Sequence, residues 1–316
     1  LVHRKQIYDQ WLERIKNFLG ISKKEIGQIC GNKKNISKII TVAMMQSLVK
    51  YPSLKDIGEL FGTIIVDECQ HIPAKSFRQL IKNFNPYYIY GLTATPKRKY
   101  NDEKLIFLYI GDIICDLKNI LDLKDDKAKD HIRVEVKKTE LDFPYDNKTD
   151  DFQLLARVLV YDSNRNKLIS DDVLKAVSEK HKALILTERK EHTEVLYALL
   201  KSYCEVISIT GDDSISSRKT KLQQINSGNF QVLITTGQLL GEGFDIGYID
   251  CLFLVFPFSF EGKLIQYIGR ILRFGGKKFI YDYRDIHIEF LDKLYKKREK
   301  YYRKINTLQL EGLKKL

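Results

Sequence analysis

The sequence has few cysteines, and none of them is arranged for metal binding. Its 316 residues include five cysteines, which are scattered and never form a CxxC pair. An odd, dispersed set argues against a disulfide framework or a cysteine zinc site and favours a reducing compartment, which we expect to be the cytoplasm. The apolar runs are also far shorter than the roughly 18 residues of a membrane span. We therefore expect no membrane partner.

Acidic residues are in a minority, because 53 Lys and Arg stand against 41 Asp and Glu, a net charge of +12. This excess favours an anionic partner, most simply nucleic acid, although a merely basic globular protein would share it. The residues 291–316 hold nine basic and three acidic side chains and so carry half of the excess. A hydrophobic content of 44% and a length of 316 residues indicate an ordinary globular protein of one or two domains.

The stretch Phe61–Pro73, FGTIIVDECQHIP, holds the densest cluster of candidate catalytic groups. Its short β-branched run, bounded by Gly62 and a polar cluster, predicts a buried parallel strand. The carboxyl end of that strand would carry Asp67 and Glu68 at the edge of the sheet where open α/β folds bind ligands. One carboxylate can hold Mg²⁺, and its neighbour can orient and deprotonate a water molecule. An acidic strand end that caps the next helix is the alternative.

Strands and helices alternate in two blocks of the chain, which predicts βαβ units and a mainly parallel sheet in each block. The second block repeats the first weakly, at offsets of about 180 to 193 residues. We therefore expect an α/β protein of two similar lobes, residues 1–145 and 146–290, connected by the polar stretch at residues 140–150. A basic helical tail, residues 291–316, would follow them.

Apolar spacing places several elements that matter below. It predicts a helix over Gln6–Leu19 with Trp11 on its core side, and a strand over Ile132–Lys138 within the first lobe. A further helix over Gly262–Leu272 would present arginines from one face into a cleft between the lobes. The tail helix, over Ile286–Leu316, would be a solvated helix or, through tyrosines among its lysines, a further nucleic-acid contact.

Seven stretches of the chain, in family order, resemble the motifs of superfamily 2 nucleic-acid helicases of the DExH type. These stretches are LVHRKQIYDQW (motif Ia), ITVAMMQSL (Ic), VDECQH (II), LTATPKR (III), ALILTERKEH (IV), VLITTGQLLGEGFD (V) and QYIGRILR (VI). The chain looks most like the XPB-like branch, and TGQLLGEGFD also resembles helicases attached to primase-like domains in TOTE-type conflict systems. The resemblance implies two tandem RecA-like lobes, use of ATP and Mg²⁺, and motor activity on nucleic acid.

The resemblance assigns residues to a split ATP site. Asp67 would hold Mg²⁺, and Glu68 would activate water against the ATP γ-phosphate. His71 would sense that phosphate and couple it to Thr93 and Thr95. The groups expected from the second lobe are Gln266, Arg270 and Arg273 at the triphosphate and Gly243 and Asp245 at the nucleotide. Salt bridges on a surface helix are the alternative for the arginines, and a plain turn is the alternative for the glycine.

The same resemblance implies a nucleic-acid path over motifs Ia, Ic, IV and V. The candidate phosphate contacts are Arg4, Gln46, Arg189, Thr236 and Gln238. Contacts to phosphates carry no direct sequence information, so low sequence specificity is expected, with DNA favoured over RNA. Each of these side chains is alternatively a solvated surface group.

One part of the family pattern is absent. No G-K-[ST] sequence occurs in the 316 residues, whereas the family cradles the phosphates in a G-x-x-x-x-G-K-[ST] loop. The chain begins without Met on what reads as the tail of a strand, so we interpret it as a fragment, truncated before motif Ia and inactive alone. Two alternatives remain: an ATPase-inactive nucleic-acid-binding module, and the motor subunit of a restriction or conflict system with a fused or neighbouring primase or nuclease.

Overall fold

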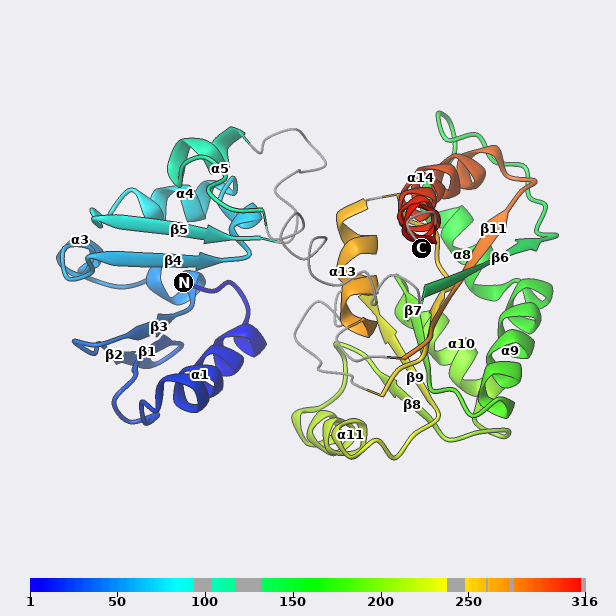
Figure 1. The fold of residues 1–316 in the computed structure, drawn as a ribbon, viewed down its shortest axis with the longest axis horizontal. Coiled ribbons are helices and arrows are strands. Elements are labelled where there is room, and N and C mark those ends of the chain that lie inside the picture. The colour runs from blue at the N-terminus through cyan, green and yellow to red at the C-terminus, as the bar shows by residue number, and fades with distance from the viewer. Residues whose placement is uncertain (94–103, 117–131, 238–247, 260, 273–275, 314–316) are drawn as a thin grey trace. The chain divides into compact units, whose positions relative to one another are not determined.

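A computed structural model describes residues 1–93, 104–116, 132–237, 248–259, 261–272 and 276–313. The chain divides into two compact units, Leu1–Leu117 and Lys118–Leu316, and each contains its own sheets and helices (Figure 1). Within the described residues, no helix combines the length and the hydropathy that crossing a membrane requires.

The strands of the first unit form two small sheets that the first residues of the chain connect. The strands are Gly27–Cys30 (β1), Lys33–Asn35 (β2), Thr41–Ala43 (β3), Thr63–Asp67 (β4) and Tyr88–Leu92 (β5). β1 pairs antiparallel with β2 and parallel with β3, and β4 pairs parallel with β5. Val2 forms a bridge with Met44 beside β3, and the carbonyl of Leu1 accepts a hydrogen bond of 2.9 Å from the Asp67 amide in β4.

Short helices and one long helix surround these strands. They are Lys5–Leu19 (α1), Met45–Leu48 (α2), Leu54–Gly58 (α3), Lys75–Ile81 (α4), Lys104–Tyr109 (α5) and the 3₁₀ turn Cys69–His71 (η1). The helix α1 ends as predicted, because Gly20 adopts the left-handed conformation (φ 69°) that closes helix C-termini. Its apolar side packs with Ile26 and Val42, whereas β4 packs with α2 and α4.

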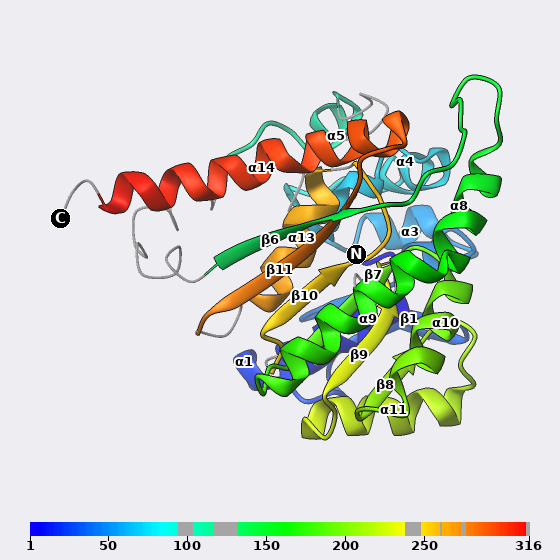
Figure 2. The same cartoon turned by 90° about the vertical axis from the view of Figure 1, so that its right-hand side faces the viewer.

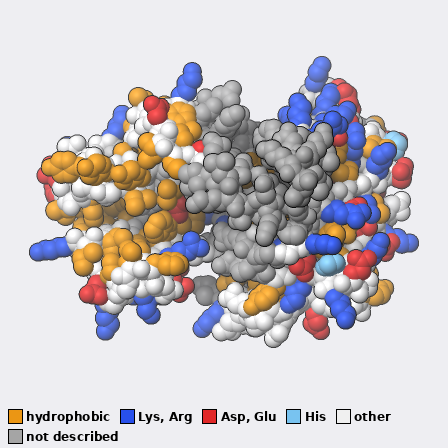
Figure 3. Space-filling model, viewed as in Figure 1, with side chains coloured by type: hydrophobic (Ala, Val, Ile, Leu, Met, Phe, Trp, Pro, Cys, Tyr) orange, Lys and Arg blue, Asp and Glu red, His pale blue; other side chains and the backbone are white. Residues whose placement is uncertain are grey.

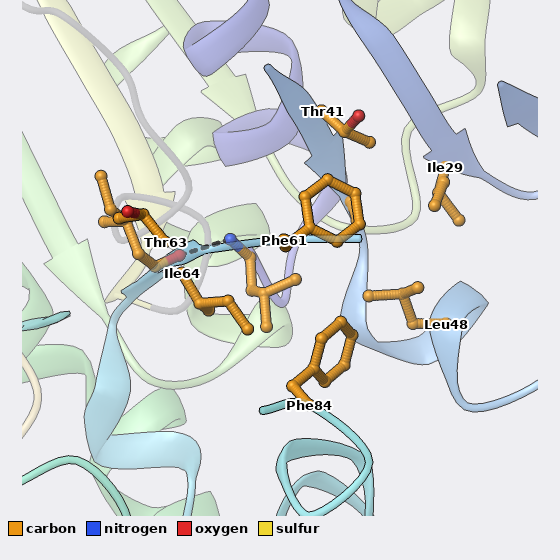
Figure 4. Close-up of a pocket in the computed structure, with 10 residues that line it drawn as sticks. Ile29, Thr41, Leu48, Phe61, Thr63, Ile64 and Phe84 are labelled. Carbon is orange, nitrogen blue, oxygen red and sulfur yellow. Dashed lines mark hydrogen bonds between the residues drawn. The ribbon is translucent and has the colours of Figure 1, made fainter. Parts of the chain in front are cut away.

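One face of the β4–β5 pair carries apolar side chains that the described residues leave open. Tyr88 and Tyr90 of β5 and Ile65 of β4 are 62%, 41% and 41% exposed, and Figure 3 shows apolar side chains gathered over this part of the first unit. Parallel strands are normally covered on both faces. A separate apolar pocket of ≈ 60 Å³, lined by side chains such as Leu48, Phe61 and Phe84, contains none of the candidate site residues (Figure 4).

The second unit is built on a six-stranded parallel sheet. Its strands are Ile132–Thr139 (β6), Ala183–Thr187 (β7), Val206–Ile209 (β8), Val232–Thr236 (β9), Cys251–Leu254 (β10) and Lys278–Asp285 (β11). They lie in the order β6-β11-β10-β7-β9-β8, with every neighbouring pair parallel (Figure 2). β7 and β10 are buried along their whole length, as expected of interior strands covered on both faces.

Helices cover both faces of this sheet and make a three-layer unit. They are Phe152–Tyr161 (α8), Ser163–Ser178 (α9), Lys190–Leu200 (α10), Ile215–Ser227 (α11), Glu261–Ile271 (α13) and Glu289–Leu313 (α14). α9 and α10 pack on one face, and α11, α13 and α14 pack on the other. The side chains of Asp151, Asp162 and Ser214 accept backbone hydrogen bonds at the starts of α8, α9 and α11, which fixes where these helices begin.

The part of the basic tail whose side chains are described, residues 291–303, packs on the second unit, which corrects the expectation that it is a solvated helix or a tyrosine-mediated strand contact. Tyr295 and Tyr302 of α14 are each 4% exposed and belong to the same core as α13. Between them, Arg298 forms a buried bidentate ion pair with Asp282 of β11, at 2.8 Å for Nε–Oδ2 and 2.7 Å for Nη2–Oδ1. The lysines of the tail made the whole helix look exposed, although one of its faces is core.

The strand β6 lies in the second unit, not in the first lobe as expected. It pairs with β11 from Ile132 opposite Lys278 to Thr139 opposite Asp285. The chain divides at Leu117, so the expected connection at residues 140–150 falls after the first strand of the second unit. The β1–β2 hairpin, α3 and α8 are not among the elements that the sequence predicted.

Candidate functional site

The paired carboxylates lie at the carboxyl end of β4. Ile64 and Val66 point into the core while the alternate residues of the strand are more exposed, so the strand delivers Asp67 to the sheet edge. Glu68, the next residue, has φ 53° and ψ 50°. A non-glycine residue in the left-handed region costs of order 1–3 kcal/mol and is enriched at functional sites. The turn η1 then begins directly after Glu68, and partly buries both carboxylates.

Two neutral groups fix the carboxylate of Asp67. Its Oδ1 accepts a hydrogen bond of 2.9 Å from the Glu68 amide, and its Oδ2 accepts one of 2.8 Å from the indole Nε1–H of Trp11. The sequence predicted Trp11 as a core residue of α1, and the structure shows it partly buried with its N–H on the acidic site. Both donors are uncharged, and each oxygen of the Asp67 carboxylate has a further lone pair.

This donor set fits a magnesium ion that remains largely hydrated. Mg²⁺ is usually bound through one or two carboxylates plus phosphates and several waters, not by an all-protein cage. Asp67 and Glu68 supply two adjacent carboxylates, and no group of three or more potential metal ligands occurs in the described part of the chain. The Glu68 carboxylate accepts a hydrogen bond from the side-chain amide of Gln70, which orients it beside Asp67.

His71 stacks against a second histidine that the sequence did not predict as a site residue. The ring centroids of His3 and His71 are 4.0 Å apart, with an interplanar angle of 36°. Burial, together with His71 and Arg4 nearby, lowers the pKa of His3 to about 3, so His3 is neutral at pH 7. Within the described residues, neither ring nitrogen of His3 has a hydrogen-bond partner. Its position one residue before Arg4, in motif Ia, is the signal that could have drawn attention to it.

Thr93 lies close to the carboxylates in the sheet. Leu92 is the register partner of Asp67, and Thr93 follows it at the carboxyl end of β5. Gly91 is required there, because a Cβ would come within 2.8 Å of the Cys69 sulfur in η1. β5 therefore packs tightly on the turn that carries His71. Thr95 lies outside the described residues.

The nucleic-acid candidates of the first unit lie side by side. Arg4 is the N-cap residue of α1, in extended conformation and partly buried. The exposed side chain of Gln46 donates a hydrogen bond of 2.6 Å to the carbonyl of His3, the residue before Arg4. Motifs Ia and Ic are thus connected directly at the start of α1.

The second unit places its candidates at the carboxyl ends of β7 and β9 and on α13. Thr236, the last residue of β9, pairs in register with Thr187 of β7, and Arg189 follows two residues later. The Arg189 guanidinium lies 5.9 Å from each of two ring centroids, those of Phe152 and Phe256. The remaining partly buried candidates are Gln266 and Arg270 on α13. Gln238, Gly243, Asp245 and Arg273 lie outside the described residues.

A cluster that the sequence missed fastens α13 to the strand ends. Glu188, directly after β7, accepts hydrogen bonds from Lys263 Nζ at 2.7 Å and from the Tyr267 hydroxyl at 3.0 Å. Burial and the neighbouring carboxylate raise the pKa of Tyr267 far above its usual value. Gly237 leaves room for this pair, since a Cβ there would lie 1.7 Å from the Tyr267 oxygen. Motifs IV, V and VI therefore meet at Glu188.

The chain consists of two α/β units, and a strand of the first unit ends at an Asp-Glu pair. Family comparisons agree for both parts of the chain. Residues 1–98 match the family "Type III restriction enzyme, res subunit", and residues 165–275 match "Helicase conserved C-terminal domain". With these two matches, the chain belongs to the superfamily 2 helicases.

Several similar curated proteins carry helicase or translocase names. A protein of Acanthamoeba polyphaga mimivirus named as an ATP-dependent RNA helicase is 26% identical, over 96% of this chain and 58% of its own length. IRC3 of Saccharomyces cerevisiae, named as an ATP-dependent helicase, is 28% identical over 76% of this chain and 36% of its own. The DNA 3'-5' translocase XPB2 of Sulfurisphaera tokodaii is 24% identical over 84% and 66%. The chain thus spans about half the length of the first two relatives.

Solved structures confirm the fold. Dbp5 of S. cerevisiae, bound to RNA and ADP BeF3, aligns with a TM-score of 0.61 at 15% identity, over 98% of this chain and 80% of its own. The Pyrococcus furiosus Hef helicase domain aligns with a TM-score of 0.54 at 14% identity, over 94% and 88%. At such low identity these matches bear on architecture alone, and they agree with the predicted RecA-like lobes.

Proposed function

We propose that the chain is most of the motor of an ATP-dependent helicase or translocase of the XPB-like branch, acting on nucleic acid and on DNA in preference to RNA. The observation that carries the proposal is the Asp67–Glu68 pair at the end of β4, held by neutral donors and bordered by His71 and Thr93. Both donors to Asp67 are uncharged, and no side-chain cation is bonded to it among the described residues.

Each described residue has a definite task in this proposal. Asp67 holds the hydrated Mg²⁺, which supplies charge neutralisation for the phosphates when it is bound. Glu68, oriented by Gln70, accepts a proton from the attacking water. Arg270 on α13, with Arg273, stabilises negative charge on the phosphoryl group, a contribution of about 10³–10⁵ in rate in other NTPases. Glu188 keeps α13 in place for this purpose.

The phosphate-binding loop is proposed to lie upstream of Leu1 in a longer polypeptide. The 316 residues contain no G-K-[ST] sequence, and the mimivirus relative extends well beyond the matched region, since the match covers 58% of it. The open apolar face of the β4–β5 pair offers a surface on which further chain can pack. The chain by itself is accordingly expected to bind ATP poorly and to hydrolyse almost none.

Nucleic acid is proposed to contact Arg4 at the start of α1 and Gln46 of α2 in the first unit. In the second unit it is proposed to contact Thr236 at the end of β9 and Arg189 just after β7. Such contacts reach phosphates and do not read base edges. Affinity should therefore fall with salt and depend little on sequence. The curated relatives are named for both RNA and DNA, so stimulation by single-stranded DNA, duplex DNA and RNA has to be compared directly.

The test is nucleic-acid-stimulated ATP hydrolysis by the full-length polypeptide that contains this chain. Glu68→Gln should lower kcat by about 10²–10⁴ and preserve ATP binding, because it removes the base but keeps the shape. Glu59→Gln, an exposed acid in the same unit, is the matched control and should behave like wild type. A full-length protein with an intact phosphate loop but no stimulated ATPase would refute the proposal and favour the ATPase-inactive binding module.

The motor subunit of a restriction system is a second candidate, favoured by the family match of residues 1–98. It uses the same chemistry in another setting. Stimulation of the ATPase by duplex DNA alone would favour the restriction motor. A nuclease domain in the same polypeptide or in a partner subunit would favour it as well. A primase domain in that position would indicate a conflict-system motor instead.

A further inference from the structure

The start of α1 is joined to the acidic end of β4 by side chains at two points. At the first, the Trp11 indole N–H donates to Asp67 Oδ2 at 2.8 Å. At the second, the His3 ring stacks on the His71 ring with centroids 4.0 Å apart. Arg4 lies between these points in the sequence, and Gln46 holds the backbone of His3. The first half of α1 and the residues just before it therefore contact both the proposed nucleic-acid residues and the proposed metal ligand, Asp67.

We propose that Trp11 is a positioning residue that orients the Asp67 carboxylate. Nucleic acid bound at Arg4 and Gln46 sets the position of α1, and the Trp11 hydrogen bond passes that position on to Asp67. The position of α1 thereby changes the affinity of the acidic pair for a divalent cation. The inference rests on the proposed function for its nucleic-acid part. The metal part stands on the hydrogen bond from Trp11 and can be tested without ATP hydrolysis.

An indole N–H suits this task because it is neutral. A lysine or arginine at the same place would hold the carboxylate but also cancel its charge, and a cation would then bind weakly. With Trp11 on Oδ2 and the Glu68 amide on Oδ1, the plane of the Asp67 carboxylate is fixed while both oxygens keep lone pairs. Groups that orient a metal ligand in this way typically change metal affinity or activity by 10–100-fold when they are removed.

The indole ring also transmits movement. Trp11 lies in the second turn of α1, whose first turn follows Arg4, and the helix is a rigid body on this length scale. A phosphate drawn to Arg4 shifts the start of α1, and the Trp11 donor moves with it. The His3–His71 contact moves in the same sense, because His3 directly precedes Arg4. Both contacts bear on the turn that holds Glu68.

The direct test is Mn²⁺ binding to this chain, followed by electron paramagnetic resonance, without nucleotide. Trp11→Phe keeps the aromatic bulk and loses the donor, and it should weaken Mn²⁺ binding by about 10–100-fold. Trp11→His retains a ring N–H and should recover part of that loss. Wild-type Mn²⁺ affinity in Trp11→Phe would overturn the positioning role, because the donor would then have no effect. An equal loss of affinity in both variants would also overturn it, because the loss would then come from packing and not from the N–H donor.

A spectroscopic test uses the fact that Trp11 is the single tryptophan of the protein. A ¹H–¹⁵N spectrum therefore contains one tryptophan indole N–H signal, and Mn²⁺ should broaden it in wild type but not in Asp67→Ala. Glu59→Ala, an exposed acid of the same unit, should leave the broadening intact. Broadening that persists in Asp67→Ala would place the ion elsewhere and overturn the metal part.

The coupling part is measured in the full-length polypeptide as the ratio of stimulated to basal kcat. Trp11→Phe should lower that ratio at least fivefold when Mg²⁺ is subsaturating and less when Mg²⁺ is saturating. An unchanged ratio at low Mg²⁺ would refute the coupling. If the full-length wild type shows no ATPase at all, the proposed function fails, whereas the Mn²⁺ results on this chain remain decisive for the positioning role.

Discussion

Replacing Arg298 with methionine should selectively destabilise the second unit. The Arg298 guanidinium donates to both oxygens of Asp282, at 2.8 and 2.7 Å, and to the carbonyl of Phe258. The side chains of the ion pair are 2% and 0% exposed. After the substitution, Asp282 would keep only the Tyr302 hydroxyl, at 2.7 Å, as a side-chain donor. The contacts of Arg298 connect three elements: α14 itself, the strand β11 and the loop that follows β10. Their loss therefore weakens the packing of all three.

The magnitude follows from the charge that is left behind. Removing one partner of a buried ion pair costs about 3–5 kcal/mol, because the remaining charge stays uncompensated. Domains have total stabilities of about 5–15 kcal/mol, so this is a large fraction. With a urea m-value of about 2 kcal/mol/M, the unfolding midpoint should fall by about 1.5–2.5 M. Replacing Asp282 with leucine as well should restore part of the loss, since no buried charge then remains.

The assay separates the units by their probes. The only tryptophan, Trp11, lies in the first unit, whereas far-UV circular dichroism reports both units. Arg298→Met should move the circular-dichroism transition and leave the Trp11 fluorescence transition in place. Lys297→Met, which removes an exposed cation from the same helix, is the matched control and should stay within about 0.5 kcal/mol. If Arg298→Met unfolded like Lys297→Met, α14 would be a dispensable tail after all.

Two further predictions concern the second unit. Burial, with Arg165 nearby, lowers the pKa of His192 to about 3, so between that pH and about 6.5 the unfolded chain binds more protons and stability falls as the solution is acidified. His192→Gln should reduce this slope of up to about 1.4 kcal/mol per pH unit. A slope in His192→Gln equal to that of the wild type would refute the prediction. Gly237→Ala should lower the Tm of the second unit, because its Cβ meets the Tyr267 oxygen at 1.7 Å, whereas a Cβ at Gly269 meets nothing within 4 Å. If Gly237→Ala were as stable as Gly269→Ala, α13 would be able to shift away from the added Cβ without cost, and the prediction would be refuted.

Local patterns were sufficient for the elements with clear boundaries. The helix predicted over Gln6–Leu19 is observed as α1, Lys5–Leu19, because its apolar spacing marks the buried side and Gly20 marks the end. The position of the acidic pair at the end of β4 was also predicted from the sequence, since a short apolar run directly precedes the two carboxylates. The RecA-like identity of the lobes was instead implied by the resemblance of seven stretches of the chain to helicase motifs, and the structural neighbours agree with it.

Pairing between distant segments was not predictable from such patterns. The strand β6 alternates in polarity like any edge strand, and nothing local says which sheet it extends. Its place is fixed by backbone pairing with β11 and by the buried hydrogen bond of 2.7 Å from Thr139 to Asp285, 146 residues away. The prediction of a solvated tail helix was wrong for a related reason. A count of charged residues does not distinguish a buried arginine such as Arg298 from one on the surface.

The site residues that the sequence missed are those whose role depends on a long-range contact. The spacing of Ile7, Trp11 and Ile15 correctly placed Trp11 on the inner side of α1. Periodicity reports which side of a helix is buried, but it does not show where an indole N–H will find its acceptor. The Trp11–Asp67 contact spans 56 residues, and it became apparent only with the fold.

The buried carboxylates of β11 and the carboxylate that ends β4 differ in what compensates them, and this difference separates structure from candidate function. Asp282 and Asp285 are 0% and 1% exposed, and each meets a buried guanidinium, that of Arg298 or Arg165. Their charges are cancelled inside the protein, so they stabilise β11 and have no capacity for a ligand. Asp67 is oriented as firmly, but by a peptide amide and an indole. Neither of these donors carries a charge, which agrees with the proposed role of Asp67 as a ligand of a hydrated divalent cation.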